Sequence, residues 1–281
     1  MAELLLGAPV AAALTERYRP VADQLAKDFH RPALAVVRVG EREEDAAYRR
    51  ALEKRCAAMG VEFRLAALSE NVSKAELVQT IHALNKDASV HGVLIFRPLP
   101  DELDEAARAA LSVHKDVDGI TDGALAALLT GAEAFAPCTA LACIAMLDHY
   151  GCEIAKKRVA VVGRSLVVGR PLALLLCQRD ATVTICHSRT RDLPSILKEA
   201  DIVISAAGRA NLIGADCLSS RQVVVDVGMN VVDGRLTGDV DLAAAKEIVS
   251  AVTPVPGGVG AVTAATLVAN VIRAAQKAYG R

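Results

Sequence analysis

Short apolar runs alternate with longer amphipathic segments along most of this 281-residue chain. The runs are rich in β-branched residues and have the length of buried parallel strands. The segments between them repeat apolar residues at helical spacing. We therefore predict strands at 34–39, 61–68, 90–96, 159–162, 181–186, 201–206, 223–227 and 247–252. Strands that alternate with helices predict an α/β fold with parallel sheets.

The predicted helices are bounded by residues that start or stop helices. Ser73 followed by Glu76 has the spacing of a capping box, and Thr139 is the predicted N-cap of a later helix. A second α/β unit starts at Arg158, so we expect a domain junction in the helix that begins near Thr139. The helices are predicted at 8–29, 45–59, 73–85, 103–111, 139–150 and 263–279, with another after Gly163.

Composition narrows the class of protein. Hydrophobic residues make up 53% of the chain and charged residues 23%, which is enough for a sizeable core. The net charge is −1, aromatic residues make up 3%, and tryptophan is absent, so we expect no binding of nucleic acid or of a membrane surface.

The seven cysteines indicate a reducing compartment. Their number is odd, no C-x-x-C pair occurs, and most lie in apolar runs. The N-terminus lacks the pattern of a signal peptide, and no uninterrupted apolar run is long enough to span a bilayer. We therefore expect a cytoplasmic protein, without a metal site.

A glycine turn follows the strand 159–162. Gly163 comes directly after that strand, and Pro171 lies in the first turn of the next helix. Free N–H groups at such a turn favour a phosphate. The spacing departs from G-x-G-x-x-G, because Arg164 and Ser165 follow Gly163 and the next glycine is Gly169. From this pattern alone, an ordinary strand–helix corner stays an alternative.

Several loop motifs in a fixed order resemble the bifunctional methylenetetrahydrofolate dehydrogenase/methenyltetrahydrofolate cyclohydrolase family. The resemblance covers essentially the whole chain, and its glycine-rich stretches are its most specific part. The motifs are Tyr48, Pro98-Leu-Pro100, Asp116-Val-Asp-Gly119, Pro137-Cys-Thr139, Gly163 to Pro171, Asp226-Val-Gly-Met-Asn230, Gly238-Asp-Val240 and Thr253 to Gly260.

The resemblance implies two α/β domains that flank a cleft. An N-terminal folate domain would comprise 1–138 and 262–281, and a Rossmann-type, doubly wound cofactor domain would comprise 139–261. The C-terminal helix would return to the first domain. Members of the family are commonly homodimers through the cofactor domain, and their substrates are one-carbon derivatives of tetrahydrofolate.

The resemblance also implies residues for the folate. Asp118 would pair with the guanidine-like edge of the pterin, a role that suits a carboxylate. Tyr48 would offer its ring face to the folate and, with Asp118, belongs to the expected catalytic residues. Without the resemblance, an acidic turn and an ordinary packed tyrosine stay alternatives. Further expected substrate-binding residues are Pro98, Leu99 and Pro100, which would form an apolar wall, and Pro256, Gly257 and Gly258 near the nicotinamide.

The cofactor would lie on the loops that follow two strands. Hydrogen-bond donors and positive charge after the strand 181–186 favour the 2′-phosphate of NADP over NAD, which stays the alternative. His187 in the same loop could equally be a solvated residue. The expected cofactor-binding residues are Gly163, Arg164, Ser165, Ser188, Arg189 and Met229.

The chain departs from the family at two catalytic positions. The family pattern Tyr-Val-x-x-Lys is Tyr48-Arg-Arg-Ala-Leu52 here, so Leu52 takes the place of the lysine. Phe96 takes the place of the family's glutamine. Lys54 lies about 200° around the helix from Leu52 and would point away. The candidates for a substitute cation are Arg97, Lys54 and Arg49.

These losses affect the two reactions differently. Hydrolysis of the methenyl group needs acid–base assistance, which neither Leu52 nor Phe96 can give. Hydride transfer mainly needs two rings held face to face. We therefore expect an NADP-dependent dehydrogenase with weak or lost cyclohydrolase activity. Two alternatives remain: a non-catalytic folate- and dinucleotide-binding paralogue, or a dehydrogenase with an altered substrate.

Overall fold

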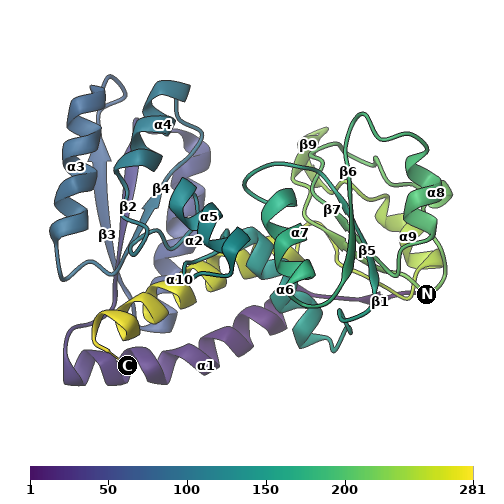
Figure 1. The fold of residues 1–281 in the computed structure, drawn as a ribbon, viewed down its shortest axis with the longest axis horizontal. Coiled ribbons are helices and arrows are strands. Elements are labelled where there is room, and N and C mark those ends of the chain that lie inside the picture. The colour runs from purple at the N-terminus through teal and green to yellow at the C-terminus, as the bar shows by residue number, and fades with distance from the viewer. Residues whose placement is uncertain (281) are drawn as a thin grey trace. The chain divides into compact units, whose positions relative to one another are not determined.

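The computed structural model describes residues 1–280, which divide into two compact units. One unit consists of Met1–Ala12 and Thr139–Thr263, and the other of Ala13–Cys138 and the segment from Ala264 onward. Figure 1 shows strands alternating with helices in both units. The chain has the predicted α/β fold, and each unit has its own parallel sheet.

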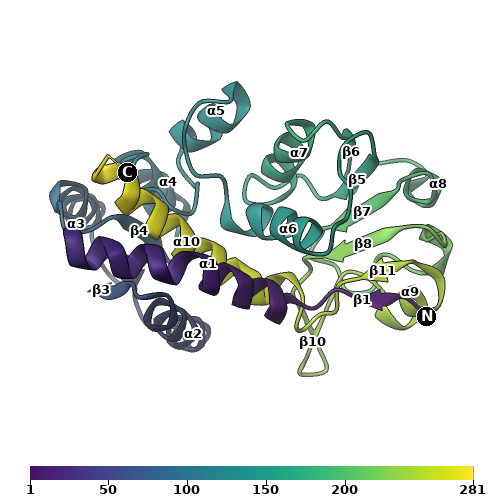
Figure 2. The same cartoon turned by 90° about the horizontal axis from the view of Figure 1, so that it is seen from below.

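The unit built mainly from 13–138 is a three-stranded sheet between two layers of helices. Its parallel strands have the order β3-β2-β4, with β2 at Ala33–Val39, β3 at Glu62–Leu68 and β4 at Gly92–Ile95. Because side chains alternate along a strand, each face of β2 supplies a different core. Leu34 and Val36 pack with α1, α2 and α10, whereas Ala35 and Val37 pack with α3 and α4. Figure 2 shows the helices around this sheet. The helices are α1 (Gly7–Asp28), α2 (Glu43–Met59), α3 (Lys74–Lys86), α4 (Asp101–Ala110) and α10 (Val259–Ala278).

The predicted capping of α3 is confirmed, but the short helices α5 (Asp122–Thr130), α8 (Leu193–Lys198) and α9 (Leu242–Ile248) were not predicted. The Ser73 side chain accepts a hydrogen bond from the Glu76 N–H, 3.2 Å away. The first of the missed helices, α5, begins after Thr121, whose hydroxyl accepts from Ala124 N, and ends at Gly131 in the left-handed region. It was missed because its alanines and leucines do not alternate with polar residues at helical spacing.

The other unit holds a six-stranded parallel sheet of order β1-β11-β8-β7-β5-β6. The order places β5 between β7 and β6, so the loops after β5 and β6 emerge side by side. The strands are β1 (Glu3–Leu4), β5 (Arg158–Val162), β6 (Thr182–Cys186), β7 (Ile202–Ser205), β8 (Val223–Asp226) and β11 (Ala251–Val252). The other elements are α6 (Cys138–His149), α7 (Gly169–Cys177), α8 (Leu193–Lys198), a 3-10 turn (Ala215–Cys217), a hairpin of β9 (Asn230–Val232) and β10 (Arg235–Thr237), and α9 (Leu242–Ile248).

The first twelve residues do not belong to the unit in which we placed them. We expected 1–138 to lie in one domain, yet β1 pairs in parallel with β11 at the edge of the larger sheet. The amide of Leu5 continues this pairing by donating to the carbonyl of Val252. A two-residue strand carries too weak a hydrophobic pattern to be recognised in the sequence.

Two further boundaries differ from the prediction. The strand expected at 247–252 shrinks to Ala251–Val252, because Glu247 and Ile248 complete α9. The helix expected to be capped by Thr139 begins at Cys138, so Thr139 lies inside its first turn.

The C-terminal helix α10 is long and apolar enough to cross a membrane by length and composition alone. Most of the helix, however, is buried inside the protein: 67% of its most apolar 18-residue stretch is buried. Val268, Val271 and Ile272 belong to the same core as Leu34 and Val36. Its apolar character is therefore explained by its place in the core.

Candidate functional site

The loop between α4 and α5 contains one acid that holds the backbone, Asp116, and one that is accessible, Asp118. Asp116 is fully buried, and its carboxylate accepts from the N–H groups of Ile120 (3.1 Å) and Thr121 (2.8 Å). Gly119 has a φ of +65°, and a Cβ there would lie 2.6 Å from the carbonyl oxygen of Phe135. Asp116 and Gly119 thus fix the turn that presents Asp118.

Asp118 is partly exposed and carries a perturbed carboxyl group. Burial raises its pKa to about 6, although hydrogen bonds from the thiol and the N–H of Cys138 oppose the shift. The charge of Asp116 adds to the rise, and the guanidinium of Arg97 opposes it. A carboxylate with an accessible side and fixed neighbours can accept paired hydrogen bonds from a ligand.

Two residues support this loop that the sequence analysis did not single out as site residues. The Asn270 side chain on α10 donates to the carbonyl oxygen of Val117 (2.9 Å) and lies 3.6 Å from the Cys138 sulfur. The Cys138 thiol is 3.2 Å from the same carbonyl. Asn270 has no nearby motif, but a buried amide within an apolar C-terminal helix was an available signal.

Tyr48 lies on α2 and is coupled to Asp118. Its pKa is raised above the ordinary value, first by burial of the hydroxyl and then by the negative charge of Asp118. The residue as a whole is 40% exposed, so part of the ring remains accessible. The ring centroid lies 5.4 Å from that of Phe96. The structure therefore brings Tyr48, Asp118 and Phe96 together.

The two positions at which the chain departs from the family are apolar and buried. Leu52 has no exposed surface and Phe96 is 4% exposed, and both belong to the core formed by α2, β2 and α10. Lys54 is exposed on α2. Neither a proton acceptor nor an ammonium group therefore stands at position 52 or 96.

Arg97, one of the candidates for a substitute cation, pairs with a neighbouring acid. Its guanidinium makes two hydrogen bonds to Asp104 on α4, of 2.6 and 3.0 Å, and Asp104 also accepts from Arg108. In the next segment Pro98 and Pro100 are exposed, while Leu99 turns toward the core beside α3 and α4. Leu99 is therefore partly buried and packs against the core of this unit.

The remaining expected folate residues, Pro256, Gly257 and Gly258, belong to the other unit. Gly257 has a φ of +101°, and its carbonyl accepts from the Gly7 N–H at 2.8 Å. A Cβ on Gly258 would lie 2.5 Å from the carbonyl oxygen of Pro254. Side chains are therefore excluded from both glycines by the local backbone.

The glycine turn after β5 is as compact as its sequence indicated. Gly163 has a φ of +129°, and a Cβ there would lie 2.3 Å from the carbonyl oxygen of Ala206. Gly169 opens α7, where a Cβ would lie 2.1 Å from the carbonyl oxygen of Gly163. The Ser165 hydroxyl accepts from Val168 N at 3.1 Å, so this side chain orders the turn.

The loop after β6 adjoins this turn, because Val162 and Cys186 are partners in the β5–β6 pair. It is ordered from within: Thr190 accepts from His187 N (2.8 Å), and the His187 ring accepts from Arg189 N (3.1 Å). His187 is therefore a loop-ordering residue. Ser188, Arg189 and Arg164 are exposed. Serine and arginine donors on two adjacent loops fit the phosphates of a dinucleotide.

Two buried acids organise the neighbouring loops. Asp239 accepts from Ser205 Oγ (3.0 Å) and from the N–H groups of Ala207 (2.7 Å), Gly208 (3.1 Å) and Arg209 (2.8 Å). Asp226 accepts from the N–H groups of Gly228, Asp239 and Val240, and burial raises its pKa to about 6. Together they hold the loop after β7 and the turn that presents Met229, which is 71% exposed.

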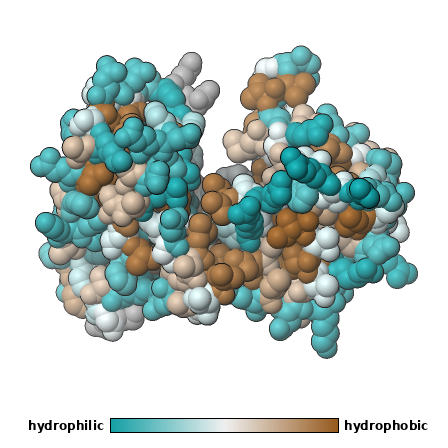
Figure 3. Space-filling model, turned by 45° about the horizontal axis from the view of Figure 1, so that its top comes forward, coloured by the Kyte–Doolittle hydropathy of each residue, from teal (hydrophilic) through white to brown (hydrophobic). Residues whose placement is uncertain are grey.

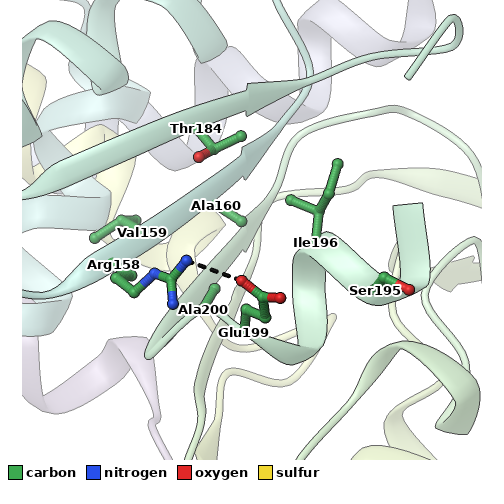
Figure 4. A pocket seen from close by; sticks show the side chains of 8 residues that line it. All are labelled: Arg158, Val159, Ala160, Thr184, Ser195, Ile196, Glu199 and Ala200. Carbon is green, nitrogen blue, oxygen red and sulfur yellow. Dashed lines mark hydrogen bonds and ion pairs between the residues drawn. The ribbon is translucent and has the colours of Figure 1, made fainter. Parts of the chain in front are cut away.

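Two cavities lie away from the expected site residues. One of about 250 Å³ lies beside β5, β6 and α8, where Arg158 pairs with Glu199 at 2.8 Å (Figure 4). Another of about 350 Å³ lies between α1 and the end of α10. None of the residues that line them is an expected site residue. On the surface, exposed apolar residues form separate patches among polar ones on the face drawn in Figure 3.

Comparison with known proteins identifies both parts of the chain. Residues 5–118 match the profile of the tetrahydrofolate dehydrogenase/cyclohydrolase catalytic domain, and residues 137–279 match the NAD(P)-binding domain of the same family. The chain belongs to the tetrahydrofolate dehydrogenase/cyclohydrolase family. A relative named bifunctional protein FolD, from Dictyoglomus thermophilum, is 41% identical over the full length of both chains.

Solved structures of the family agree with this assignment. A bifunctional FolD from Campylobacter jejuni has a TM-score of 0.95 and 36% identity, with 99% of each chain covered. A FolD from Trypanosoma brucei, complexed with NADP and an inhibitor, has a TM-score of 0.93 and 33% identity, covering 100% of this chain and 99% of its own. The predicted family, two-domain α/β fold, returning C-terminal helix and dinucleotide-binding domain are confirmed.

Proposed function

We propose that this family member oxidises 5,10-methylenetetrahydrofolate to 5,10-methenyltetrahydrofolate with NADP, and that its cyclohydrolase activity is weak or lost. The observation that carries the proposal is the state of the folate unit. Asp118 and Tyr48 are presented together, whereas Leu52 and Phe96 are buried and apolar. Binding and positioning groups are retained, and the acid–base groups are absent.

In the proposed reaction a hydride leaves the methylene bridge for the nicotinamide ring, which is the chemistry that NADP supplies. Asp118 holds the pterin edge, and the ring of Tyr48 lies against the folate. Pro98, Leu99 and Pro100 border the substrate, and Pro256, Gly257 and Gly258 line the nicotinamide end. The phosphates and the 2′-phosphate are held by Gly163, Arg164, Ser165, Ser188 and Arg189, with Met229 contributing its backbone.

NADP is proposed over NAD because of the charge of the two loops. Arg164 and Arg189 are exposed and follow adjacent strands, and the residues directly after β6 are His187, Ser188 and Arg189, none of them acidic. An acidic side chain there would favour the free 2′-hydroxyl of NAD. The NADP complex of the Trypanosoma brucei relative supports the same choice.

The test is a spectroscopic assay with methylenetetrahydrofolate and NADP. The methenyl product should accumulate, and its absorbance should decay no faster than in enzyme-free buffer. Decay above that spontaneous rate would show an active cyclohydrolase. Absence of both turnover and folate binding would contradict the dehydrogenase assignment itself.

We further propose that the protein is a cytoplasmic homodimer that associates through the dinucleotide-binding unit. The support is the family membership together with β6, an edge strand on which Ile185 is 41% exposed. Light scattering of the purified protein tests the stoichiometry. Ile185→Lys should shift the population toward monomer, and an unshifted dimer would exclude this edge as the interface.

A further inference from the structure

The folate unit contains a buried arginine that the proposed reaction does not yet use. Arg38 is the sixth residue of β2, and its side chain is only 10% exposed. Its Nη1 donates to Glu41 at 3.0 Å, but the Glu41 side chain is 70% exposed. Its Nε is buried and has no hydrogen-bond partner. A buried donor without an acceptor is costly, so its retention calls for a reason.

The register of the sheet places Arg38 beside Phe96. Val36 is the partner of Leu94 and Val37 that of Ile95, and Phe96 N donates to the carbonyl of Val37. Even-numbered residues of β2 face α2 and α10, as Leu34 and Val36 do, so Arg38 shares that face. It is the charged end of an otherwise apolar row, next to the residue that contacts Tyr48.

Helix α2, which packs on this face of β2, carries a second arginine with a buried Nε that lacks a hydrogen-bond partner. Asp45, Arg49, Leu52 and Cys56 have the spacing of one helical stripe, and Asp45, Leu52 and Cys56 are buried. Because β2 and β3 are parallel, α2 runs back along the sheet and its first turns lie over the end of β2. Arg49 Nε is likewise buried without a hydrogen-bond partner, and it forms an ion pair with Glu53 at 3.8 Å.

The acids near these guanidinium groups do not satisfy them. Asp45 is already bound through both oxygens to Arg42, at 2.7 and 2.8 Å. Glu41 and Glu53 have side chains that are 70% and 40% exposed. Among the side chains that the structure describes around Arg38 and Arg49, positive charge therefore exceeds buried negative charge. An oxygen-bearing ligand would supply the missing acceptor.

We propose that Arg38 is a folate-binding residue, which donates from its guanidinium to an oxygen of the bound ligand. The inference rests on the proposed folate site. Such an oxygen belongs either to a carboxylate of the glutamate tail or to the pterin and one-carbon end. A guanidinium group donates hydrogen bonds but accepts none, so Arg38 binds and orients the ligand but does not replace a proton-shuttling lysine.

The test compares ligand affinity with stability in Arg38→Leu, a change that extends the apolar row of Leu34 and Val36. Calorimetry with 5-formyltetrahydrofolate should show an affinity loss of about 10- to 100-fold, the usual effect of removing a charge-assisted hydrogen bond. The melting temperature without ligand should stay equal or rise, because an unpaired buried donor is removed. Arg38→Met provides a second apolar variant if the first fails to fold.

A second probe, 5-formyltetrahydropteroate, lacks the glutamate tail and identifies the oxygen. If Arg38→Leu weakens only the folate, Arg38 binds the tail carboxylate; if it weakens both probes, Arg38 binds the pterin or one-carbon end. Arg64→Leu is the matched control, because Arg64 on β3 pairs with Glu62 on the surface and should leave both affinities unchanged.

Unchanged affinities for both probes would overturn the inference, and a lower melting temperature of the same variant would then assign Arg38 a structural role. Failure of the wild-type protein to bind either probe is a different result, because it contradicts the proposed folate site as a whole. The two failures are therefore distinguishable in the same experiment.

Discussion

The two units hold acids with similar pKa shifts in different surroundings. Asp226 and Asp118 both have their pKa raised to about 6, mainly by burial. Asp226 is 3% exposed, and its carboxylate is occupied by three backbone N–H groups. Asp118 is partly exposed and lies beside an accessible tyrosine ring. A raised pKa by itself therefore does not separate an acid that shapes loops from one that can receive a ligand; the remaining accessible surface does.

The largest expected effect is the loss of stability when Asp239, a buried acid that organises the loops, is replaced. Asp239→Ala leaves the hydroxyl of Ser205 and the N–H groups of 207–209 without their acceptor. We expect the free energy of unfolding to fall by about 3–5 kcal/mol, as for other buried polar networks. Urea denaturation measures this, with Glu247→Ala on the exposed surface of α9 as the control. A loss below about 1 kcal/mol, the size of one ordinary hydrogen bond, would contradict the organising role of Asp239.

Asp118→Asn should change binding rather than folding. The amide keeps the shape but loses the charge and one acceptor for the pterin edge, which corresponds to about 2–3 kcal/mol of binding free energy. Titration with 5-formyltetrahydrofolate measures the loss. The paired variant Asp116→Asn should instead lower the melting temperature, because Asp116 holds the loop. Equal effects of the two variants on affinity would remove the distinction between them.

Cofactor choice should depend on the exposed cations. Arg189→Ala and Arg164→Ala should each lower kcat/KM for NADP about tenfold relative to NAD, the size of one charge-assisted contact. Arg158→Ala is the control, since Arg158 lies at the opposite end of β5 and pairs with Glu199. An unchanged NADP-to-NAD ratio would place the 2′ position elsewhere.

The smallest expected effect is that of pH on stability and on folate affinity. The pKa values of Asp118 and Asp226 are raised in the folded state, so between about pH 4 and 6 the folded protein binds more protons than the unfolded chain. Their contribution to stability therefore rises as pH falls through 6. Folate affinity should change in the opposite direction, because protonated Asp118 accepts fewer hydrogen bonds. Parallel unfolding and titration experiments from pH 5 to 7.5 check both signs, and Asp118→Asn should flatten the affinity profile.

The long apolar runs allowed most of the fold to be predicted. The strands around Val36, Leu94 and Val161 and the turn at Gly163 all carried strong local signals. The short strand β1 and the hairpin of β9 and β10 could not be predicted, because two or three residues define them. The strand β1 forms through pairing with the distant strand β11, and β9 and β10 form through pairing with each other, rather than through their own periodicity.

Sequence motifs predicted only those residues of the candidate site that lie within the motifs themselves. Asp118, Tyr48 and the glycine turns were recognised in this way. The supporting residues were missed for different reasons. Asp239 lies in a recognised motif but had no assigned role, and Asn270 lies in an apolar helix. Arg38 interrupts an apolar run whose pattern predicts a buried strand. Most hydrogen-bond partners of Asp239 and Asn270 belong to segments that are distant in the sequence, so the local pattern does not specify them.

The pairing of β1 with β11 has a consequence for biosynthesis. Glu3 and Leu4 are synthesised long before their partners Ala251 and Val252. This segment must therefore remain unpaired until β11 has been made, and the larger sheet is completed only then. A bulky group attached next to β1 would interfere with that late docking.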